Sequence, residues 1–372
     1  MERKLVTIRK VRDISPIPGA DFIETATVDG WNLIIKKGEF EVDGLGVYFE
    51  IDSVLPMDDR YQFLKKVTVT SGGEGYRLKT MKMRGTISQG LLLPMSMFPE
   101  LEGKEFGDDV TDDLGVWLYE PKYSARNPNS NGEQKTRYFP PFLRKTDEAR
   151  IQNHMNYFDL YKGQLWEASL KLDGSSCTIW NYDKAPYVKQ GKSNKFFVSL
   201  YYGVREWIKA KFANPDTFGV CSRNINLREK EGNAFWDIAN ELSMRTILSG
   251  HNVALQGELI GPNIQRNHEK VDKNEFHLFA IFDIDKQEYL LPHERTEWLF
   301  NNDPLDIIKH VPIHGLVDIF ETCEDVAAMQ EFVEGESMNP GTISEGMVFK
   351  SVTQRGQSFK CISNKYLLKC ED

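Results

Sequence analysis

The first third of the chain is a series of short β-prone runs separated by turn signals. Residues 5–8, 24–28, 32–35 and 46–51 are rich in Val, Ile, Thr and aromatic residues. Pro-Gly and Asp-Gly turn signals lie between these runs. Many short strands at this spacing favour a small closed β-barrel.

The remainder of the chain mixes strand and helix patterns. The chain has 372 residues, which suits about two domains, each with a full core. Residues 253–260 and 276–284 have the pattern of strands, whereas 205–212 and 235–242 have helical spacing. This mixture predicts an α+β fold in which antiparallel sheets follow the barrel.

A polar stretch divides the two patterns. Residues 121–141 are rich in Pro, Asn and Gly and lack periodicity, which is typical of a linker or mobile loop. We therefore predict a barrel over residues 1–120, the linker over 121–141, and a mixed α/β domain over 142–372.

Composition and charge exclude several classes of protein. No apolar run approaches the length of a membrane span, and the N-terminus lacks the apolar segment of a signal peptide. The five cysteines are scattered and never spaced as C-x-x-C, so we expect no zinc site, no disulfide framework and a reducing, intracellular compartment. The net charge of −9 argues against a non-specific nucleic-acid coat protein, but it allows an enzyme with a local basic groove.

A lysine follows an apolar alternating run in the second part of the chain. Residues 165–170 have a strand pattern, and Lys171 then opens the tetrapeptide K-L-D-G. A lysine amine attacks only when it is neutral, so it needs neighbouring cations or desolvation to lower its pKa. Taken alone, the tetrapeptide indicates an exposed hairpin with a surface lysine more readily than it indicates a nucleophile.

Charged residues recur inside or beside later apolar strands. Glu258 lies within an apolar run, and Glu345 and Lys350 bracket another one. A charge in such a position is costly unless it is paired or faces a ligand cavity. Because charges of both signs recur on successive strands, we favour one shared polar site over separate, solvent-exposed charges at the strand ends.

The order of these motifs resembles that of the covalent nucleotidyltransferases, which comprise ATP-dependent DNA and RNA ligases and mRNA capping enzymes. The motifs are K-x-D-G at 171–174, S-R-N at 222–224, G-E-L at 257–259, F-D-I at 282–284, E-G-x-V-F-K at 345–350 and F-K-x-I-S-N-K at 359–365. The chain is most similar to the Deinococcus-type nick-sealing RNA ligases, also known from Naegleria, which carry an OB-fold before the catalytic domain. Residues 85–94 also resemble the final strand of tRNA-binding OB barrels, and 146–153 resemble the pre-catalytic nucleotide-binding segment of these ligases.

The resemblance implies a set of roles. Lys171 is the nucleophile that becomes linked to AMP, and Lys350 and Lys360 hold the α-phosphate and help keep Lys171 unprotonated. The nucleotide-binding residues implied are Arg150, Gln152, Asn153, Leu170, Arg223, Glu258, Phe282, Lys350, Lys360 and Lys365. The residues implied for Mg²⁺ (or Mn²⁺), through its waters, are Asp173, Glu258 and Glu345.

Some assignments remain open at this point. Phe282 is predicted to stack on adenine, with Phe279 in the core if the strand is regular. Ile362 stands where some RNA ligases carry a second lysine, so either Lys360 or Lys365 could contact the α-phosphate. Glu258 could bind either the ribose or the metal.

The function implied is that of an ATP-dependent RNA ligase. Such an enzyme seals 3′-hydroxyl/5′-phosphate nicks in RNA or RNA/DNA duplexes, and we expect a monomer without membrane association. Four basic residues of the barrel are predicted to grip the duplex: Arg77, Lys79, Lys82 and Arg84. The alternatives are a capping guanylyltransferase and a non-catalytic OB-fold RNA-binding protein.

Overall fold

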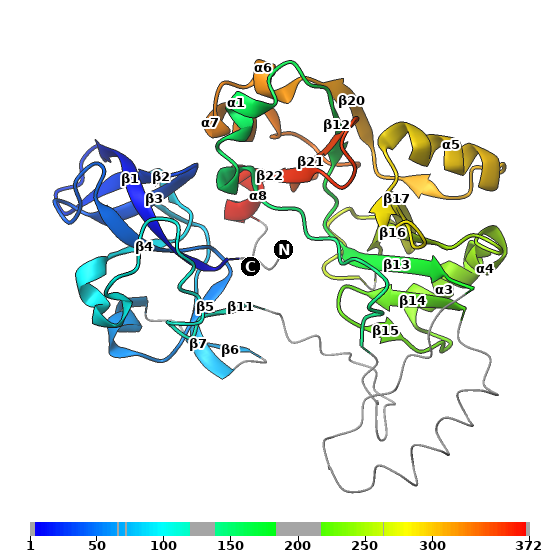
Figure 1. Ribbon diagram of the computed structural model, residues 1–372, viewed down its shortest axis with the longest axis horizontal. Coiled ribbons are helices and arrows are strands. Elements are labelled where there is room, and N and C mark those ends of the chain that lie inside the picture. Colours follow the sequence, from blue (N-terminus) through cyan, green and yellow to red (C-terminus); the bar gives the residue numbers. More distant parts are fainter. Residues whose placement is uncertain are drawn as a thin grey trace, which may run out of the picture.

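A computed structural model describes residues 4–64, 67–70, 73–119, 138–183, 217–262 and 264–369. A β-rich N-terminal part lies on the left in Figure 1, and the mixed α/β part occupies the centre and right. The helix predicted at 205–212 and most of the linker predicted at 121–141 lie outside the described residues.

The N-terminal part is built from antiparallel strands, as predicted. One sheet has the order β10-β4-β1-β2-β3, with β1 Val6–Pro16, β2 Ile23–Val28, β3 Trp31–Lys36, β4 Leu45–Phe49 and β10 Leu91–Pro94. The other has the order β11-β5-β7-β6, with β5 Ser53–Leu55, β6 Val67–Thr70, β7 Gly73–Arg77 and β11 Trp117–Leu118. A hairpin joins β8 Met81–Met83 to β9 Thr86–Ser88. Short 3₁₀ helices span Asp59–Leu64, Met95–Met97 and Pro99–Leu101.

Strand β1 explains how the first sheet curls. Its first half pairs with β4 and its second half with β2, and the register shifts between Val11 and Asp13. An irregularity of this kind bends a strand and increases its twist. The described strands therefore form a curled half-barrel sheet and a second sheet, in keeping with the small β-barrel that was predicted.

Two further sheets form the C-terminal part. The small sheet has the order β20-β12-β21-β22, with β12 Trp166–Leu170, β20 Ile313–Val317, β21 Gly346–Ser351 and β22 Ser358–Ile362. The large sheet has the order β15-β14-β13-β16-β17-β18, with β13 Ser175–Asn181, β14 Phe218–Ser222, β15 Asn226–Leu227, β16 Val253–Ile260, β17 Glu275–Asp283 and β18 Glu288–Tyr289. Strand β19, Lys309–His310, pairs with β17 in parallel, and the other pairings are antiparallel, as predicted.

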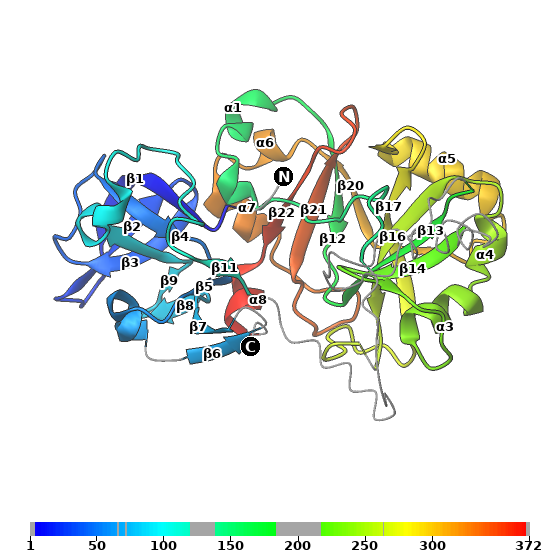
Figure 2. The same ribbon diagram turned by 60° about the horizontal axis from the view of Figure 1, so that its bottom comes forward.

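Helices cover the outer face of each sheet. They are α1 Tyr157–Leu160, α3 Ala234–Glu241, α4 Met244–Ile247, α5 Pro292–Asn302, α6 Ile319–Thr322, α7 Val326–Phe332 and α8 Asn364–Lys369, with a 3₁₀ helix at Ile151–Asn153. The large sheet packs on α3 and α4 in one cluster, and the small sheet packs on α6 and α7 in another. Figure 2 shows α1, α6 and α7 beside the small sheet, away from the large one. No helix in the described ranges is long and apolar enough to cross a membrane.

Alternation along the small sheet leaves polar residues on its other face. Ala168, Phe349 and Phe359 lie in the core beneath α6 and α7. Because neighbouring residues of a strand point to opposite faces, Lys350 and Lys360 point away from this core. Lys350 and Lys360 thus lie on the face of the small sheet opposite to α6 and α7.

The N-terminal part contacts the C-terminal part directly. Trp31 Nε1 donates a hydrogen bond to Asn153 Oδ1 at 3.0 Å, and Asn153 Nδ2 donates to Glu50 Oε1 at 3.2 Å. A second contact joins Gln89 Nε2 to Asn364 Oδ1 at 3.2 Å.

Candidate active site

Strand pairing brings the predicted lysines onto one surface. Lys350 on β21 lies opposite both Glu167 on β12 and Ser358 on β22. Lys360 lies one row further along, opposite Val348. Lys171 follows the end of β12, as predicted, and its backbone N–H donates to Gly346 O at 2.9 Å.

The amine of Lys171 is surrounded by carboxylates. Its Nζ lies 2.7 Å from Glu345 Oε1. Burial alone would lower the pKa of Lys171, but Glu345, Glu258 and Asp173 together raise it to about 12. Among the protein's own side chains, the carboxylates outweigh the nearby Lys360, and the expected lowering of this pKa by cations that include Mg²⁺ stays a prediction.

The same carboxylates are the predicted metal ligands. Burial raises the pKa of Glu258 to about 8, and burial also raises the pKa of Glu345. In the described part of the chain, however, no three His, Cys, Asp or Glu side chains are arranged to hold a metal ion. The three carboxylates do converge electrostatically on Lys171, and their predicted contact with a metal ion through its waters stays a prediction.

The glycine of K-x-D-G is required by close packing. A Cβ on Gly174 would lie 2.4 Å from Leu259 O and 3.1 Å from Glu258 Cγ, far inside van der Waals contact. Gln265 Nε2 donates to Gly174 O at 3.1 Å. The turn after Lys171 is therefore pressed against the strand that carries Glu258.

The structure distinguishes Lys360 from Lys365. Lys360 is largely buried beside Lys171, its Nζ lies 3.1 Å from Asp147 Oδ1, and burial lowers its pKa. Lys365 is exposed and forms a surface ion pair with Glu334 at 2.6 Å. Burial and proximity therefore favour Lys360 as the α-phosphate ligand. Ile362 is in the core.

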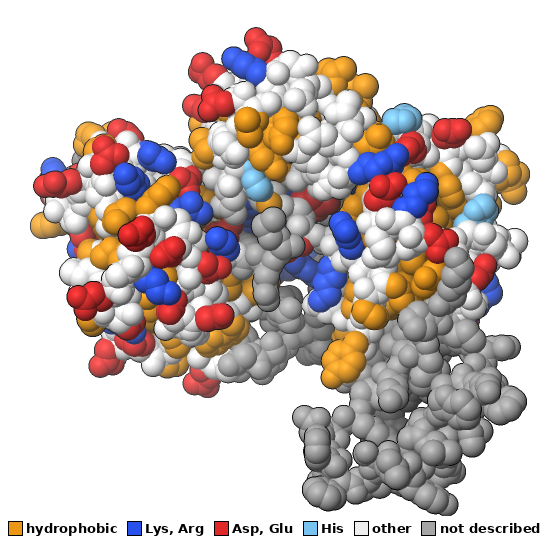
Figure 3. Space-filling view, viewed as in Figure 1, with side chains coloured by type: hydrophobic (Ala, Val, Ile, Leu, Met, Phe, Trp, Pro, Cys, Tyr) orange, Lys and Arg blue, Asp and Glu red, His pale blue; other side chains and the backbone are white. Residues whose placement is uncertain are grey.

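Arg223 extends the charged rim of the site. Its Nη2 lies 3.1 Å from Asp147 Oδ2, so Arg223 and Lys360 flank the same carboxylate. Figure 3 shows Lys and Arg side chains at the hollow between the two parts of the molecule. Basic and acidic side chains thus alternate at the rim of the site.

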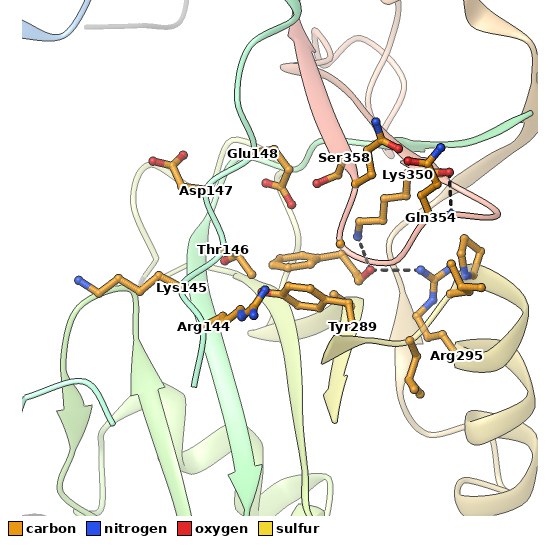
Figure 4. Close-up of a pocket in the computed structure, with 18 residues that line it drawn as sticks. Arg144, Lys145, Thr146, Asp147, Glu148, Tyr289, Arg295, Lys350, Gln354 and Ser358 are labelled. Carbon is orange, nitrogen blue, oxygen red and sulfur yellow. Dashed lines mark hydrogen bonds between the residues drawn. The ribbon is translucent and has the colours of Figure 1, made fainter. Parts of the chain in front are cut away.

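A pocket of about 240 Å³ opens beside Lys350. Its walls come from residues 144–148, from β17, from the start of α5 and from the β21–β22 connection, as Figure 4 shows. Lys350 Nζ donates a hydrogen bond to Phe279 O and lies 5.0 Å from the centre of the Phe279 ring. Burial and then Arg295 lower the pKa of Lys350 to about 8. Arg295 in turn forms a buried ion pair with Glu167 at 2.6 Å.

The predicted orientation of the two phenylalanines is wrong. Phe282 is fully buried in a cluster with Leu143 and Trp180, whereas Phe279 lines the pocket. Strand β17 is irregular: Gln256 pairs with Ala280 but Gly257 pairs with Leu278, so Phe279 is an extra residue. This bulge turns Phe279 toward the pocket, which a regular strand would not do.

Of the ten predicted nucleotide ligands, only Lys350 lines the pocket, and four of the others lie around Lys360 or in the core. Leu170 lies in the core, Gln152 is fully buried, and Asn153 bonds to the N-terminal part. Arg150 is also buried, but its Nε and Nη1 have no hydrogen-bond partner, and it lies close enough to Lys360 to lower the pKa of that lysine. An unpartnered guanidinium of this kind fits an anion.

The basic strand of the barrel is only partly a free surface. Arg77 forms an ion pair with Asp52 at 2.7 Å and lies 3.7 Å from the ring centre of Tyr119, so its predicted role in gripping a duplex is not supported. Lys82 is exposed on the β8–β9 hairpin. Arg84 Nη1 donates to Gly19 O.

Sequence reasoning missed several residues of the site. Arg144 and Arg295 line the pocket, and Tyr366 donates a hydrogen bond to Asp173. Arg144 lies just before the segment that resembles the pre-catalytic region, and Tyr366 directly follows the last motif. Their closeness to these motifs in the sequence is the signal that could have identified them. Arg295 lies on a helix far from every motif, and nothing in the sequence pointed to it.

Comparisons with known proteins agree with this geometry. A profile described as OB-fold domain matches residues 5–95, and the RNA ligase profile matches residues 164–367. No curated protein sequence matches the chain. Among solved structures, a Naegleria gruberi RNA ligase variant with ATP and Mn is 41% identical over 98% of both chains, with a TM-score of 0.82. The Naegleria gruberi RNA ligase with PPi is also 41% identical over 100% of both chains, with a TM-score of 0.82. The N-terminal part is thus an OB-fold, the fold class is α+β as predicted, and the chain belongs to the RNA ligase family.

Proposed function

We propose that this ATP-dependent RNA ligase seals 3′-hydroxyl/5′-phosphate nicks in RNA or RNA/DNA duplexes. The observation that carries the proposal is the position of Lys171, which lies among three carboxylates and beside Lys360 at the end of a rigid strand. In the first step Lys171 Nζ attacks the α-phosphorus of ATP, loses its proton and forms a phosphoramidate with AMP, while pyrophosphate leaves.

The surrounding residues suit that step. Lys360 and Arg150 supply positive charge for phosphate oxygens next to Lys171, and Lys350 supplies it beside the pocket. Phosphoryl transfer depends mainly on positioning and charge neutralisation. Lys365 is assigned no role, because its amine is paired with Glu334 on the surface.

A divalent cation fits the carboxylates around Lys171. Glu258 and Glu345 are partly buried acids whose pKa values are raised, and Asp173 adds a third hard oxygen group. Because no three such side chains in the described ranges are set for direct coordination, contact through retained waters fits best. Mg²⁺ or Mn²⁺ held here would supply positive charge that favours the neutral form of Lys171. Glu258 is accordingly assigned to the metal and not to the ribose.

The pocket beside Lys350 suits the nucleoside. Phe279 presents its ring to the pocket, so we assign adenine stacking to Phe279 in place of Phe282. Arg144 and Tyr289 form another part of the wall.

Two further steps complete sealing. AMP moves from Lys171 to the 5′-phosphate, and the 3′-hydroxyl then attacks that phosphate and releases AMP. We assign Arg223, at the rim of the site, and Lys82, on the barrel, to contacts with the phosphates of the nucleic-acid strands. We further propose that the protein acts as a monomer. The four described cysteines are free and buried, which suits a reducing, intracellular compartment.

Covalent labelling tests the proposal. Incubation with α-labelled ATP and Mg²⁺ should label the protein, and Lys171→Ala should not be labelled. A labelled Lys171→Ala variant, or labelling by GTP in preference to ATP, would contradict it. Sealing of all-RNA, all-DNA and mixed nicked duplexes then identifies the preferred break.

A further inference from the structure

Tyr366 lies against the K-x-D-G turn from the far end of the chain. It is on α8, is only 7% exposed, and its hydroxyl donates to Asp173 Oδ2 at 2.8 Å. A hydroxyl bond to a carboxylate is stronger and more directional than a bond between neutral groups. The hydroxyl therefore restricts the orientation of the Asp173 carboxylate.

The ring of Tyr366 is itself held in place. It packs with Ile362, Leu367 and Ile343, and His268 lies edge-on to it with ring centres 5.3 Å apart. His268 Nε2 is 2.7 Å from Ile343 O, so this nitrogen carries the proton and donates it. Packing around the ring therefore fixes the direction in which the Tyr366 hydroxyl points.

Helix α8 is also fastened at its first residue. Asn364 accepts a hydrogen bond from Gln89 of the OB-fold at 3.2 Å and donates one to Gln330 Oε1 on α7 at 3.2 Å. Ser363, the residue before the helix, donates its backbone N–H to Glu345 O at 2.9 Å. The element carrying Tyr366 therefore touches the strand end that carries Glu345.

We propose that Tyr366 is a positioning residue that holds the Asp173 carboxylate toward Lys171 and toward the divalent cation. The inference rests on the proposed function for the identity of that cation. Tyr366 contacts neither substrate nor reacting atoms, and it acts through Asp173. Gln265, which bonds to Gly174 O at 3.1 Å, holds the next residue of the same turn.

The test is Tyr366→Phe, which keeps the ring and its packing and removes only the hydroxyl. Loss of such an outer partner typically weakens metal affinity about 10- to 100-fold, and we expect a loss in that range. Mn²⁺ binding is measured on the full chain without nucleotide, from the electron paramagnetic resonance signal of free Mn²⁺. The matched control is Tyr161→Phe, a partly buried tyrosine in the cluster under α6, which should bind Mn²⁺ like the unchanged protein. Equal Mn²⁺ affinity in Tyr366→Phe and the unchanged protein would overturn the proposal.

A second variant separates positioning from general stability. Asp173→Ala removes the group on which Tyr366 acts, so adding Tyr366→Phe should weaken Mn²⁺ binding no further. A further loss in the double variant would mean that Tyr366 acts on the fold as a whole, and the proposal would be wrong. If the unchanged protein is not labelled by ATP, the proposed function fails, but the Mn²⁺ comparison can still be read.

Discussion

Lys171 combines two properties that oppose each other. A strand end holds it beside Lys360, where we propose that phosphate binds, yet the carboxylates around it favour the charged amine, which cannot attack. The sequence identified the residue and its acidic partners through the order of the motifs. It could not give the sign of the pKa shift, because that sign depends on which charges lie nearest in space.

The first prediction concerns pH. Since the pKa of Lys171 is raised to about 12, the neutral amine is scarce at pH 7 and grows as pH rises. At low metal concentration, the rate of lysine adenylylation should therefore rise roughly tenfold per pH unit between pH 6 and 9. More Mg²⁺ should move this rise to lower pH. Single-turnover labelling at several Mg²⁺ concentrations checks this, and a pH profile independent of metal would contradict it.

A second prediction concerns Gly174. A Cβ here would lie 2.4 Å from Leu259 O, so Gly174→Ala should displace the K-x-D-G turn and slow adenylylation at least about 100-fold. Gly335→Ala is the matched control, because its Cβ meets nothing within 4 Å. The rate of labelling by ATP measures the effect, and circular dichroism checks that both variants fold. Equal labelling rates for the two variants would contradict the prediction.

At the scale of elements, regular strands were predictable and the irregular one was not. Strand 253–260 has the bounds that the apolar pattern gave. The bulge in β17 leaves no mark in the sequence pattern, because it depends on the pairing with β16. One extra residue places Phe279 at the pocket wall, whereas Phe282, the predicted stacking residue, lies in the core.

The third prediction follows from that bulge. Phe279→Ala should raise KM for ATP about tenfold with a smaller loss of stability, because Phe279 is only partly buried and lines the pocket. Phe282→Ala should instead lower the free energy of unfolding by about 3–5 kcal/mol, since its ring is fully buried. Labelling at varied ATP and urea denaturation measure the two effects. A raised KM in Phe282→Ala and a loss of stability in Phe279→Ala would instead favour Phe282 as the stacking residue.

At the scale of the whole molecule, the OB-fold packs close to the phosphate-binding side chains. Trp31 bonds to Asn153 and lies 5.9 Å from the Arg150 guanidinium, and Ala149 O accepts a hydrogen bond from the Lys360 backbone. The sequence predicted both folds but not this contact, because Gly30 and Trp31 carry no motif. A contact between two domains depends on the shapes of their surfaces, which the pattern of residues along the chain does not give.

The fourth prediction tests this contact. A Cβ at Gly30 would lie 2.8 Å from Val326 Cγ2 and 3.0 Å from Gln152 Cα, so Gly30→Val should push the OB-fold away from the catalytic part. Adenylylation by ATP should then fall at least about tenfold, because Arg150 and Lys360 shift with their neighbours. Phe22→Ala, at an 82% exposed site of the barrel, is the control. Unchanged labelling with weaker RNA binding would mean that the OB-fold serves only the strand.

The contact between Gln89 and Asn364 also sets an order of events during folding. The two residues are 275 positions apart in the chain, so this hydrogen bond closes a very long loop. On a ribosome the barrel emerges first and folds as a unit, whereas α8 emerges only after both catalytic sheets. We therefore expect a growing chain to acquire its barrel early and its complete metal-binding turn last. Asp173 thus gains its hydrogen bond from Tyr366 only after the strands of both catalytic sheets have been made.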